Sequence, residues 1–246
     1  MHNESFRLLG LDYVYLCFDV NEETLPAAVA GLKTCGIRGF NLTMPNKNKI
    51  VELLDELSPE AQLIGAVNTV LNDNGKLIGY NTDGYGFMQS VRDAGHDITG
   101  KNITVMGVGG ASMAICAQSA LDGAASVHIF ARRTSRYWNR TQKFAENLSA
   151  KTGCQVCLFD NDDHTALRDS IAQSYLLINA TSVGMVPDID NTIIKDTSLF
   201  HPELVVADVV YEPQETRLLR EAKAAGCQTF NGMYMLLHQG AKAFQI

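Results

Sequence analysis

ITVMGVGGAS, residues 103–112, joins a short apolar run to a glycine-rich turn and decides the fold of the second half of the chain. The apolar run predicts a strand at Ile103–Gly107, and the pattern after the turn predicts a helix at Ala111–Leu121. Glycines between a strand and a helix let the backbone turn tightly and approach a pyrophosphate, which the N–H groups of the helix N-terminus bind. Ser112 stands where this dinucleotide pattern has Gly or Ala, so a tight turn without a ligand is the alternative interpretation.

The segments after this turn alternate short apolar runs with helix-period stretches, which is typical of parallel α/β proteins. A strand at Val127–Phe130 and a helix at Tyr137–Lys151 complete a βαβ unit. Further strands, with helices between them, are predicted at Gln155–Phe159, Tyr175–Asn179, Leu204–Asp208 and Gln228–Phe230. The sequence therefore predicts a Rossmann-type domain with a parallel sheet at 98–231, followed at 232–246 by a closing helix that returns to the first domain.

Residues 1–97 predict a separate α/β domain. The strong turn signal Asp73-Asn74-Gly75 lies between apolar runs at Asn68–Leu71 and Leu77–Tyr80, which predicts a β-hairpin. The other elements expected in this part are strands at Tyr13–Val20 and Gly39–Met44 and helices at Glu23–Thr34, Lys47–Leu57 and Asp83–Gly95.

The composition is that of an ordinary globular protein, since 46% of the 246 residues are hydrophobic and 19% are charged. A net charge of −7 disfavours binding to nucleic acid or to anionic membranes. No apolar run approaches the roughly 20 residues that span a bilayer, and the first residues do not resemble a signal peptide, so a cytoplasmic location is expected. Only Cys154 and Cys157 are close among the six cysteines, and they lie on a predicted strand. We therefore expect buried thiols and no metal site.

The sequence Ala-Arg-Arg-Thr-Ser-Arg, residues 131–136, follows the second strand of the βαβ unit. An Asp or Glu at the end of this strand binds the ribose 2′-hydroxyl of NAD, whereas an Arg accepts the 2′-phosphate of NADP. This stretch contains no acid, and its three arginines and two hydroxyls form a plausible phosphate site. The alternative is a solvated basic turn without a ligand.

Three polar clusters occur in the first domain, at residues 41–47, 65–69 and 80–84. Each follows a strand or begins a helix, where open α/β sheets bind their ligands. A lysine near an aspartate can move a proton to or from a substrate hydroxyl, and an amide can hold that hydroxyl in place. As isolated features, these residues are better explained without a function: Lys47 as a solvated lysine, Asp83 as a helix N-cap and Asn68 as a turn residue.

Taken in order, these motifs resemble those of the shikimate dehydrogenase family. The motifs are Asn-Leu-Thr-Met-Pro-Asn-Lys (41–47), Gly-Ala-Val-Asn-Thr (65–69), Gly-Tyr-Asn-Thr-Asp-Gly (79–84) and Gly-Val-Gly-Gly-Ala-Ser (107–112). The resemblance continues through residues 179–185, 208–213 and 232–241, so it covers essentially the whole chain. The sequence Met-Pro-Asn-Lys, residues 44–47, looks closest to that of the quinate/shikimate dehydrogenase branch.

The resemblance implies a reversible, NAD(P)H-dependent reduction of 3-dehydroshikimate or 3-dehydroquinate to shikimate or quinate, in aromatic amino acid biosynthesis. It implies a catalytic pair, Lys47 and Asp83, and a substrate pocket formed by Thr43, Asn68, Tyr211 and Gln239. On the cofactor side it implies a pyrophosphate site at Gly107, Gly109, Gly110 and Ala111, and an adenosine ribose site at Arg132, Thr134 and Arg136. It also implies cofactor contacts from the loop with Thr181 and, near the nicotinamide, from Gly232 and Met235.

The chain departs from the family pattern at three places. Ala131 replaces an Asn, and Thr134 stands near the position of an acid that holds NAD in the dual-cofactor branch, so the cofactor is NADP or NAD with NADP favoured. The first residues, Met1-His2-Asn3, match the end of a Ser-x-Ser-Pro-x-x-His-Asn stretch whose serines hold the substrate carboxylate. Beyond Phe244 the family continues into a further helix. The first domain is thus expected to be incomplete at its start, and a catalytically silent NAD(P)-binding paralogue or truncated form is the alternative to an active enzyme, which could also be a homodimer.

Overall fold

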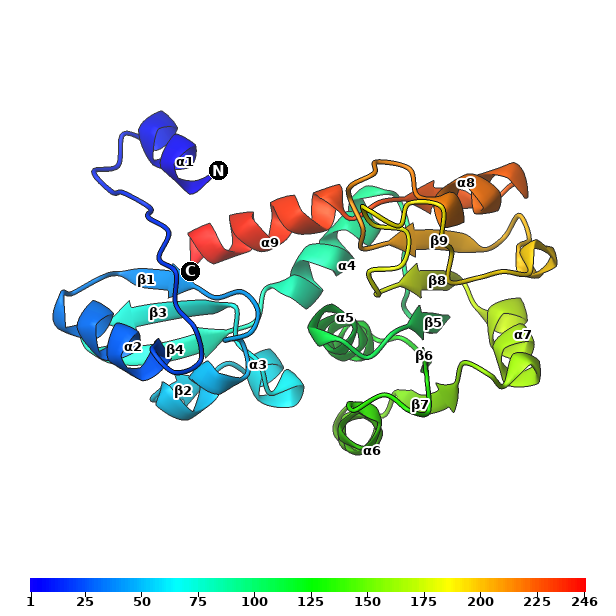
Figure 1. The fold of residues 1–246 in the computed structure, drawn as a ribbon, viewed down its shortest axis with the longest axis horizontal. Helices are drawn as coiled ribbons and strands as arrows, with labels where there is room; N and C mark the ends of the chain where they lie inside the picture. Colours follow the sequence, from blue (N-terminus) through cyan, green and yellow to red (C-terminus); the bar gives the residue numbers. More distant parts are fainter. The chain divides into compact units, whose positions relative to one another are not determined.

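The computed structural model describes residues 1–246, which divide into two compact units. One unit contains Met1–Thr82 together with Leu237–Ile246, and the other contains Asp83–Leu236. Figure 1 labels the helices and strands of both units.

The second unit is built on a six-stranded sheet with the order β10-β9-β8-β5-β6-β7. All of its pairings are parallel, which confirms the Rossmann-type sheet predicted from the sequence. The strand order reverses beside β5, because β6 lies on one side of it and β8 on the other. Ligands of such sheets bind outside the carboxyl ends of the strands at this point. The strands are β5 (Asn102–Met106), β6 (Ser126–Ala131), β7 (Gln155–Asp160), β8 (Leu176–Asn179), β9 (Val205–Asp208) and β10 (Gln228–Phe230).

Helices cover both faces of this sheet, with α5 and α6 on one side and α7 on the other (Figure 1). The central strands are almost wholly inaccessible to solvent, as the continuous apolar runs of parallel strands require. The helices are α4 (Asp83–Asp93), α5 (Gly110–Leu121), α6 (Trp138–Thr152), α7 (His164–Gln173) and α8 (Arg217–Ala224), with a short 3₁₀ turn η2 (Thr197–Leu199). No helix of the structure combines the length and the apolar character that crossing a bilayer requires.

The helix that begins at Asp83 packs against α5, so the second compact unit starts there, ahead of the residue-98 boundary predicted from the sequence. Gly84 allows this close approach. A Cβ atom at Gly84 would lie 2.3 Å from the carbonyl oxygen of Ala114 and 2.8 Å from the Cβ of Gln118. The two helices can therefore be this close only because residue 84 has no side chain.

The first unit contains a four-stranded sheet with the order β1-β3-β4-β2. The predicted hairpin is confirmed as β3 (Thr69–Asp73) and β4 (Lys76–Tyr80), joined by Asn74 and Gly75. Both turn residues have positive φ, 52° and 92°, as a two-residue hairpin turn of the favoured type needs. The remaining elements are β1 (Gly39–Asn41), β2 (Glu56–Leu57), α1 (His2–Leu9), α2 (Leu25–Thr34), α3 (Pro59–Ile64), the 3₁₀ turn η1 (Lys49–Leu53), and α9 (Met233–Gln245), which this unit shares from Leu237 onward.

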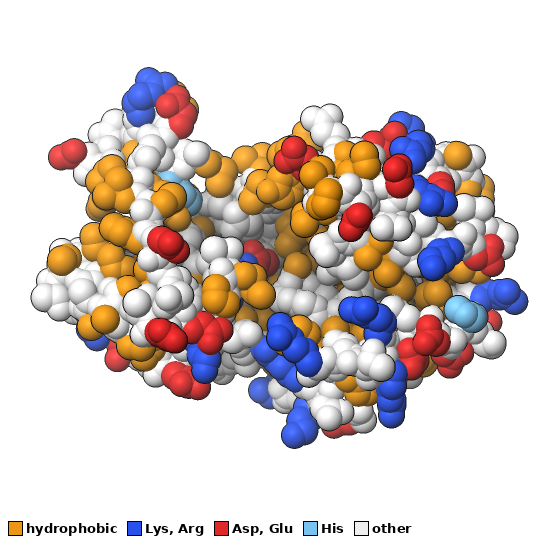
Figure 2. Space-filling view, in the orientation of Figure 1, with side chains coloured by type: hydrophobic (Ala, Val, Ile, Leu, Met, Phe, Trp, Pro, Cys, Tyr) orange, Lys and Arg blue, Asp and Glu red, His pale blue; other side chains and the backbone are white.

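The strand predicted at Tyr13–Val20 is wrong, because this segment is irregular in the structure. Its apolar side chains are exposed, Val14 by 69% and Phe18 by 64%. Figure 2 shows apolar side chains gathered on the surface around the N-terminal segment. Cys17 is exposed for the same reason, contrary to the expectation of a buried thiol. A strand forms only when its backbone groups pair with another strand, and local preference for extended structure does not supply that partner.

The helix predicted at Lys47–Leu57 is also wrong, since the segment forms η1 and then β2, which pairs in parallel with β4. Asp55 is the cause. Its backbone N–H donates to the carbonyl oxygen of Leu77 at 3.0 Å, and its carboxylate accepts from the backbone N–H of Leu77 at 2.7 Å. These two bonds hold the chain against β4 and prevent the helix from continuing.

We predict that Gly84→Ala lowers the free energy of unfolding by about 1–3 kcal/mol, because the new methyl group overpacks the contact between α4 and α5. The matched control is Gly31→Ala in α2, where an added Cβ has no neighbour within 4 Å. That change should raise stability by roughly 0.5–1 kcal/mol, the usual gain from replacing a glycine inside a helix. Urea unfolding of both variants checks this, and a Gly84→Ala protein at least as stable as wild type would contradict the packing argument.

Candidate functional site

The glycine-rich turn leaves β5 at Gly107, whose φ of 112° is a conformation that side chains disfavour. The turn is tied to the sheet by a bond from the Gly107 N–H to the carbonyl oxygen of Phe130 at 2.8 Å. Gly109 is the N-cap of α5, and an added Cβ at Gly109 or Gly110 would meet nothing within 4 Å. The first N–H groups of a twelve-residue helix therefore face an open surface, which is the arrangement that binds a pyrophosphate.

Ser112 does not block this turn. Its side chain is fully buried, and its hydroxyl donates to the carbonyl oxygen of Gly107 at 2.6 Å. The serine therefore closes the turn from inside, which explains why it can stand where a dinucleotide pattern has Gly or Ala.

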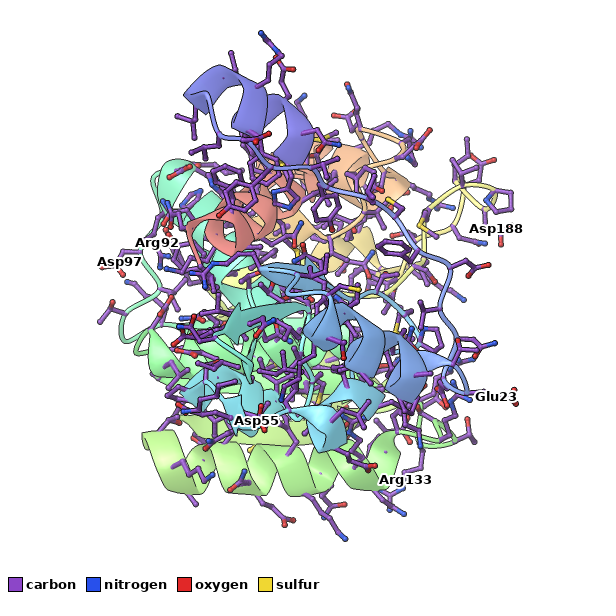
Figure 3. The ribbon with its side chains drawn as sticks, turned by 90° about the vertical axis from the view of Figure 1, so that its left-hand side faces the viewer. Glu23, Asp55, Arg92, Asp97, Arg133 and Asp188 are labelled. Carbon is purple, nitrogen blue, oxygen red and sulfur yellow. The ribbon has the colours of Figure 1, made fainter.

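The loop between β6 and α6 carries exposed basic side chains (Arg132, Arg133 and Arg136) at the end of β6. Two of them are held by aromatic rings. The guanidinium of Arg133 lies 4.6 Å from the ring centre of Trp138, at the end of α6 seen in Figure 3. Arg136 lies 4.7 Å from the ring centre of Tyr137 and also donates to its hydroxyl at 2.6 Å. Cation–π contacts and this hydrogen bond restrict both cations before any ligand arrives. The sequence reading missed these aromatic partners, although each follows its arginine closely in the chain.

Two further segments lie at the carboxyl ends of the strands in the second unit. Thr181, after β8, lies against the turn, since a Cβ at Gly107 would be 2.7 Å from its Cγ2. Gly232, after β10, lies against the end of β9, since a Cβ there would be 2.0 Å from the carbonyl oxygen of Val209. Tyr211 is exposed, and Met235 is partly buried on α9. The structure thus gathers Gly107, Thr181 and Gly232 at one edge of the sheet.

A hydrogen-bond cluster centred on Asn68 joins the polar motifs of the first unit. The Asn68 side chain is buried, donates to the Thr82 hydroxyl at 2.9 Å, and accepts from the backbone N–H of Thr82 at 3.0 Å. The Thr82 hydroxyl donates to the carbonyl oxygen of Gln239 at 3.0 Å. Asn41 contributes bonds from its amide to the backbone oxygen of Asn68 and to the hydroxyl of Thr69. Asn68 and Gln239, predicted together from the sequence, therefore share one cluster.

Backbone bonds bring the Lys47 motif to the same place. The carbonyl oxygen of Lys47 accepts from the N–H of Val67 at 2.8 Å, and the N–H of Leu42 donates to the carbonyl oxygen of Asn68 at 2.9 Å. Thr43 is exposed. Asp83 follows Thr82 directly, is buried, and begins α4. The sequence did not assign three members of this cluster, Asn41, Thr69 and Thr82.

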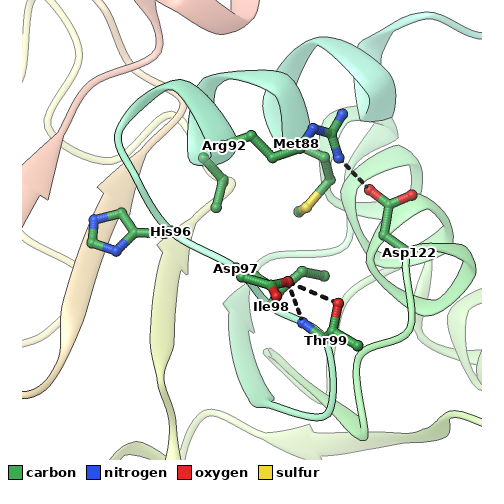
Figure 4. A pocket seen from close by; sticks show the side chains of 8 residues that line it. Met88, Arg92, His96, Asp97, Ile98, Thr99 and Asp122 are labelled. Atoms are coloured by element: carbon green, nitrogen blue, oxygen red, sulfur yellow. Dashed lines mark hydrogen bonds and ion pairs between the residues drawn. The ribbon is translucent and has the colours of Figure 1, made fainter.

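A cavity of about 230 Å³ lies elsewhere in the second unit, beside the segment that enters β5 (Figure 4). Its charged groups are already paired, because Arg92 binds Asp122 at 2.9 Å and Asp97 accepts two bonds from Thr99. The Gly107 turn lies at the opposite end of β5. This cavity is therefore not the dinucleotide site.

Comparison with known proteins gives the family. Residues 1–70 match the model of the shikimate dehydrogenase substrate binding domain. A shikimate dehydrogenase (NADP(+)) of Listeria innocua is 51% identical over 246 residues, which are 100% of this chain and 84% of the relative. The chain belongs to the shikimate dehydrogenase family. The resemblance read from the sequence motifs is thereby confirmed.

Solved structures of family members have the same fold. Shikimate 5-dehydrogenase from Listeria monocytogenes, in complex with shikimate and NAD, has a TM-score of 0.97 and 50% identity, covering 99% of this chain and 84% of that one. Quinate dehydrogenase from Corynebacterium glutamicum, in complex with NAD, has a TM-score of 0.87 and 30% identity, covering 99% and 86%. The enzyme from Thermus thermophilus, in complex with NADP(H) and shikimate, has a TM-score of 0.81 and 35% identity, covering 99% and 85%.

We predict different effects for two alanine substitutions in the glycine-rich turn: one lowers stability and the other weakens cofactor binding. Gly107→Ala should lower the free energy of unfolding, because its backbone φ of 112° and its contacts with Thr181 and Ala180 leave no place for a methyl group. Gly109→Ala should leave stability within about 0.5 kcal/mol but weaken dinucleotide binding at least tenfold, since its methyl group would stand where the pyrophosphate approaches. Urea unfolding and cofactor titration separate the two, and unchanged cofactor affinity in Gly109→Ala would place the pyrophosphate elsewhere.

Proposed function

We propose that this chain is a shikimate dehydrogenase that reversibly reduces 3-dehydroshikimate to shikimate with NADPH or NADH. The observation that carries the proposal is the 51% identity, over the whole chain, to shikimate dehydrogenases that use NADP(+). The site geometry supports it independently, because one unit holds an open helix N-terminus behind a glycine-rich turn and the other holds the Asn68 cluster.

The cofactor side of the site fits a dinucleotide. The N–H groups at Gly109, Gly110 and Ala111 would hold the pyrophosphate. The exposed side chains of Arg132, Thr134 and Arg136 would hold the adenosine ribose, and the absence of an acid in residues 131–136 favours the 2′-phosphate of NADP. Thr181, Gly232 and Met235 would complete the cofactor contacts. When bound, the reduced nicotinamide supplies the hydride.

The substrate side uses amide and hydroxyl groups to orient the ring. Asn68, Thr43 and Gln239 would bind the substrate hydroxyls, and Tyr211 would line the same pocket. The bonds to Thr82 already fix the Asn68 amide in one orientation, so little rotamer freedom would be lost when substrate binds. Reduction of a carbonyl places charge on its oxygen. Lys47, paired with Asp83, would donate the proton that this oxygen takes up, and in the reverse direction would remove it.

Shikimate is the favoured substrate over quinate. Two relatives named as shikimate dehydrogenases are 50% and 51% identical to this chain, whereas the quinate dehydrogenase is 30% identical. A catalytically silent paralogue is disfavoured because Lys47, Asp83, Asn68 and Gln239 are all present. The enzyme would thus act in aromatic amino acid biosynthesis.

A cytoplasmic location forms part of the proposal. All six cysteines are free thiols, as in proteins of reducing compartments. Burial raises the pKa of the Cys116 thiol to about 12, so this group stays protonated and unreactive. A homodimer stays a prediction, which the molar mass in solution would check.

We predict that Lys47→Ala lowers kcat for shikimate oxidation by about 10²–10⁴ and changes the KM of shikimate much less, because a general acid or base acts mainly in the transition state. Asp83→Asn should behave similarly. The matched control is Lys49→Ala, an exposed lysine at the start of η1, which should keep wild-type kcat. If Lys47→Ala kept its kcat and only raised KM, Lys47 would be a binding residue instead.

We predict that NADP binds at least as tightly as NAD, and that Arg136→Ala weakens NADP binding by about 1.5–3 kcal/mol, the value of a hydrogen bond to a charged group. NAD lacks the 2′-phosphate, so its affinity in the same variant serves as the internal control and should change little. Titration of both cofactors against both proteins gives the answer. A tenfold preference of the wild type for NAD would refute the assignment of this loop.

A further inference from the structure

Two buried polar side chains end neighbouring strands beside the glycine-rich turn. Asn179 is the last residue of β8 and Asp208 is the last residue of β9, and they are partners in the parallel ladder. Neither is accessible to solvent. The Asn179 amide donates to the carboxylate Oδ1 of Asp208 at 3.0 Å. Polar groups are rarely placed so deep unless their position matters, since an incomplete set of hydrogen bonds there is costly.

The carboxylate of Asp208 is surrounded by donors. Its Oδ1 also accepts from the backbone N–H of Val210 at 2.9 Å, and its Oδ2 accepts from the hydroxyl of Thr216 at 2.8 Å. Burial raises the pKa of this carboxyl group, and the three donors oppose that rise. Asp208 therefore serves as a fixed acceptor that orients the Asn179 amide.

Asn179 uses both donors and both lone pairs of its amide oxygen. Besides Asp208, it donates to the carbonyl oxygen of Val183 at 3.1 Å. Its Oδ1 accepts from the backbone N–H of Thr181 at 3.1 Å and from the hydroxyl of Thr181 at 2.6 Å. The Thr181 hydroxyl in turn accepts from the N–H of Val183 at 3.1 Å. The conformation of residues 180–183 is thus set by one buried amide.

This loop lies directly on the glycine-rich turn. A Cβ atom on Gly107 would be 2.7 Å from Cγ2 of Thr181 and 3.0 Å from the carbonyl oxygen of Ala180. A continuous series of contacts therefore runs from the Asp208 carboxylate through the Asn179 amide to Thr181 and then to Gly107. A displacement of the amide would move Thr181 against or away from the turn.

We propose that Asn179 and Asp208 are positioning residues for the dinucleotide, which fix the loop at Thr181 against the glycine-rich turn. The inference rests on the proposed function, since it assigns these residues to the same cofactor site. A carboxamide can donate to Asp208 and Val183 while its oxygen accepts twice from Thr181. A carboxylate at position 179 would face the Asp208 carboxylate. A hydroxyl has only one hydrogen to donate, so it could not replace both bonds that the amide donates.

The experiment measures NADPH dissociation constants by fluorescence titration, and kcat for shikimate oxidation at saturating NADP+, in the full chain. Asn179→Ala should raise the dissociation constant of NADPH at least tenfold while kcat at saturation stays within threefold. Asp208→Asn keeps an acceptor for the Asn179 amide and should bind NADPH more tightly than Asp208→Ala. The matched control is Asn102→Ala at the other end of the sheet, where Asn102 binds Gln173 and Ser126. It should lose stability without a change in NADPH affinity.

A second pair of variants covers the case in which Asn179→Ala does not fold. Thr181→Val keeps the methyl group near Gly107 but removes the hydroxyl, whereas Thr181→Ser keeps the hydroxyl. Thr181→Val should weaken NADPH binding at least threefold more than Thr181→Ser. If wild type binds NADPH and every folded variant at positions 179, 181 and 208 binds it within twofold of wild type, the inference is overturned. If wild type neither binds NADPH nor oxidises shikimate, the proposed function itself fails.

Discussion

The left-handed backbone at Gly107 is the constraint on which the site in the second unit depends. With a φ of 112°, the chain leaves β5 and enters α5 within a few residues, and the helix N-terminus comes to lie at the carboxyl edge of the sheet. Ser112 closes the turn through the Gly107 carbonyl, and Thr181 packs on the space that a side chain would need. The exposed helix N-terminus is therefore a property of backbone geometry, and the side chains around it maintain that geometry.

Both units contain a buried side-chain amide whose hydrogen bonds hold neighbouring residues in place. In the second unit, Asn179 and Asp208 satisfy each other at the ends of adjacent strands. In the first unit, Asn68 and Thr82 do so beside the hairpin. In both, an amide supplies donors and acceptors together, so a loop is fixed without a net charge on the amide. Buried networks of this kind stay rigid only when every member is satisfied, which explains why they lie next to the groups that must be held in place.

The sequence predicted the parts of the fold whose cause is local. The hairpin at Asn74-Gly75, the turn at Gly107 and the parallel strands each follow from a few adjacent residues, and all are found in the structure. The wrong elements depend on distant partners: Tyr13–Val20 has no strand beside it, and Asp55 binds Leu77 on another strand. The same reason applies to the site. The glycines and arginines of the cofactor motifs could be proposed from adjacent residues alone. The Asn179–Asp208 pair could not, because it depends on which strands are neighbours in the sheet, and the sequence does not show that.

The loop between β6 and α6 is almost separate from the structure that supports it. The side chains at positions 132, 133, 134 and 136 are exposed, and those of Ser135 and Tyr137 are half-buried. Arg133 and Arg136 contact the rings of Trp138 and Tyr137. Substitutions at these exposed positions should cost the core little. Solved family members occur in complexes with NAD and with NADP(H). Cofactor choice can thus diverge between related enzymes through a few exposed positions, with the folding free energy almost untouched, so selection can act on it without disturbing the core.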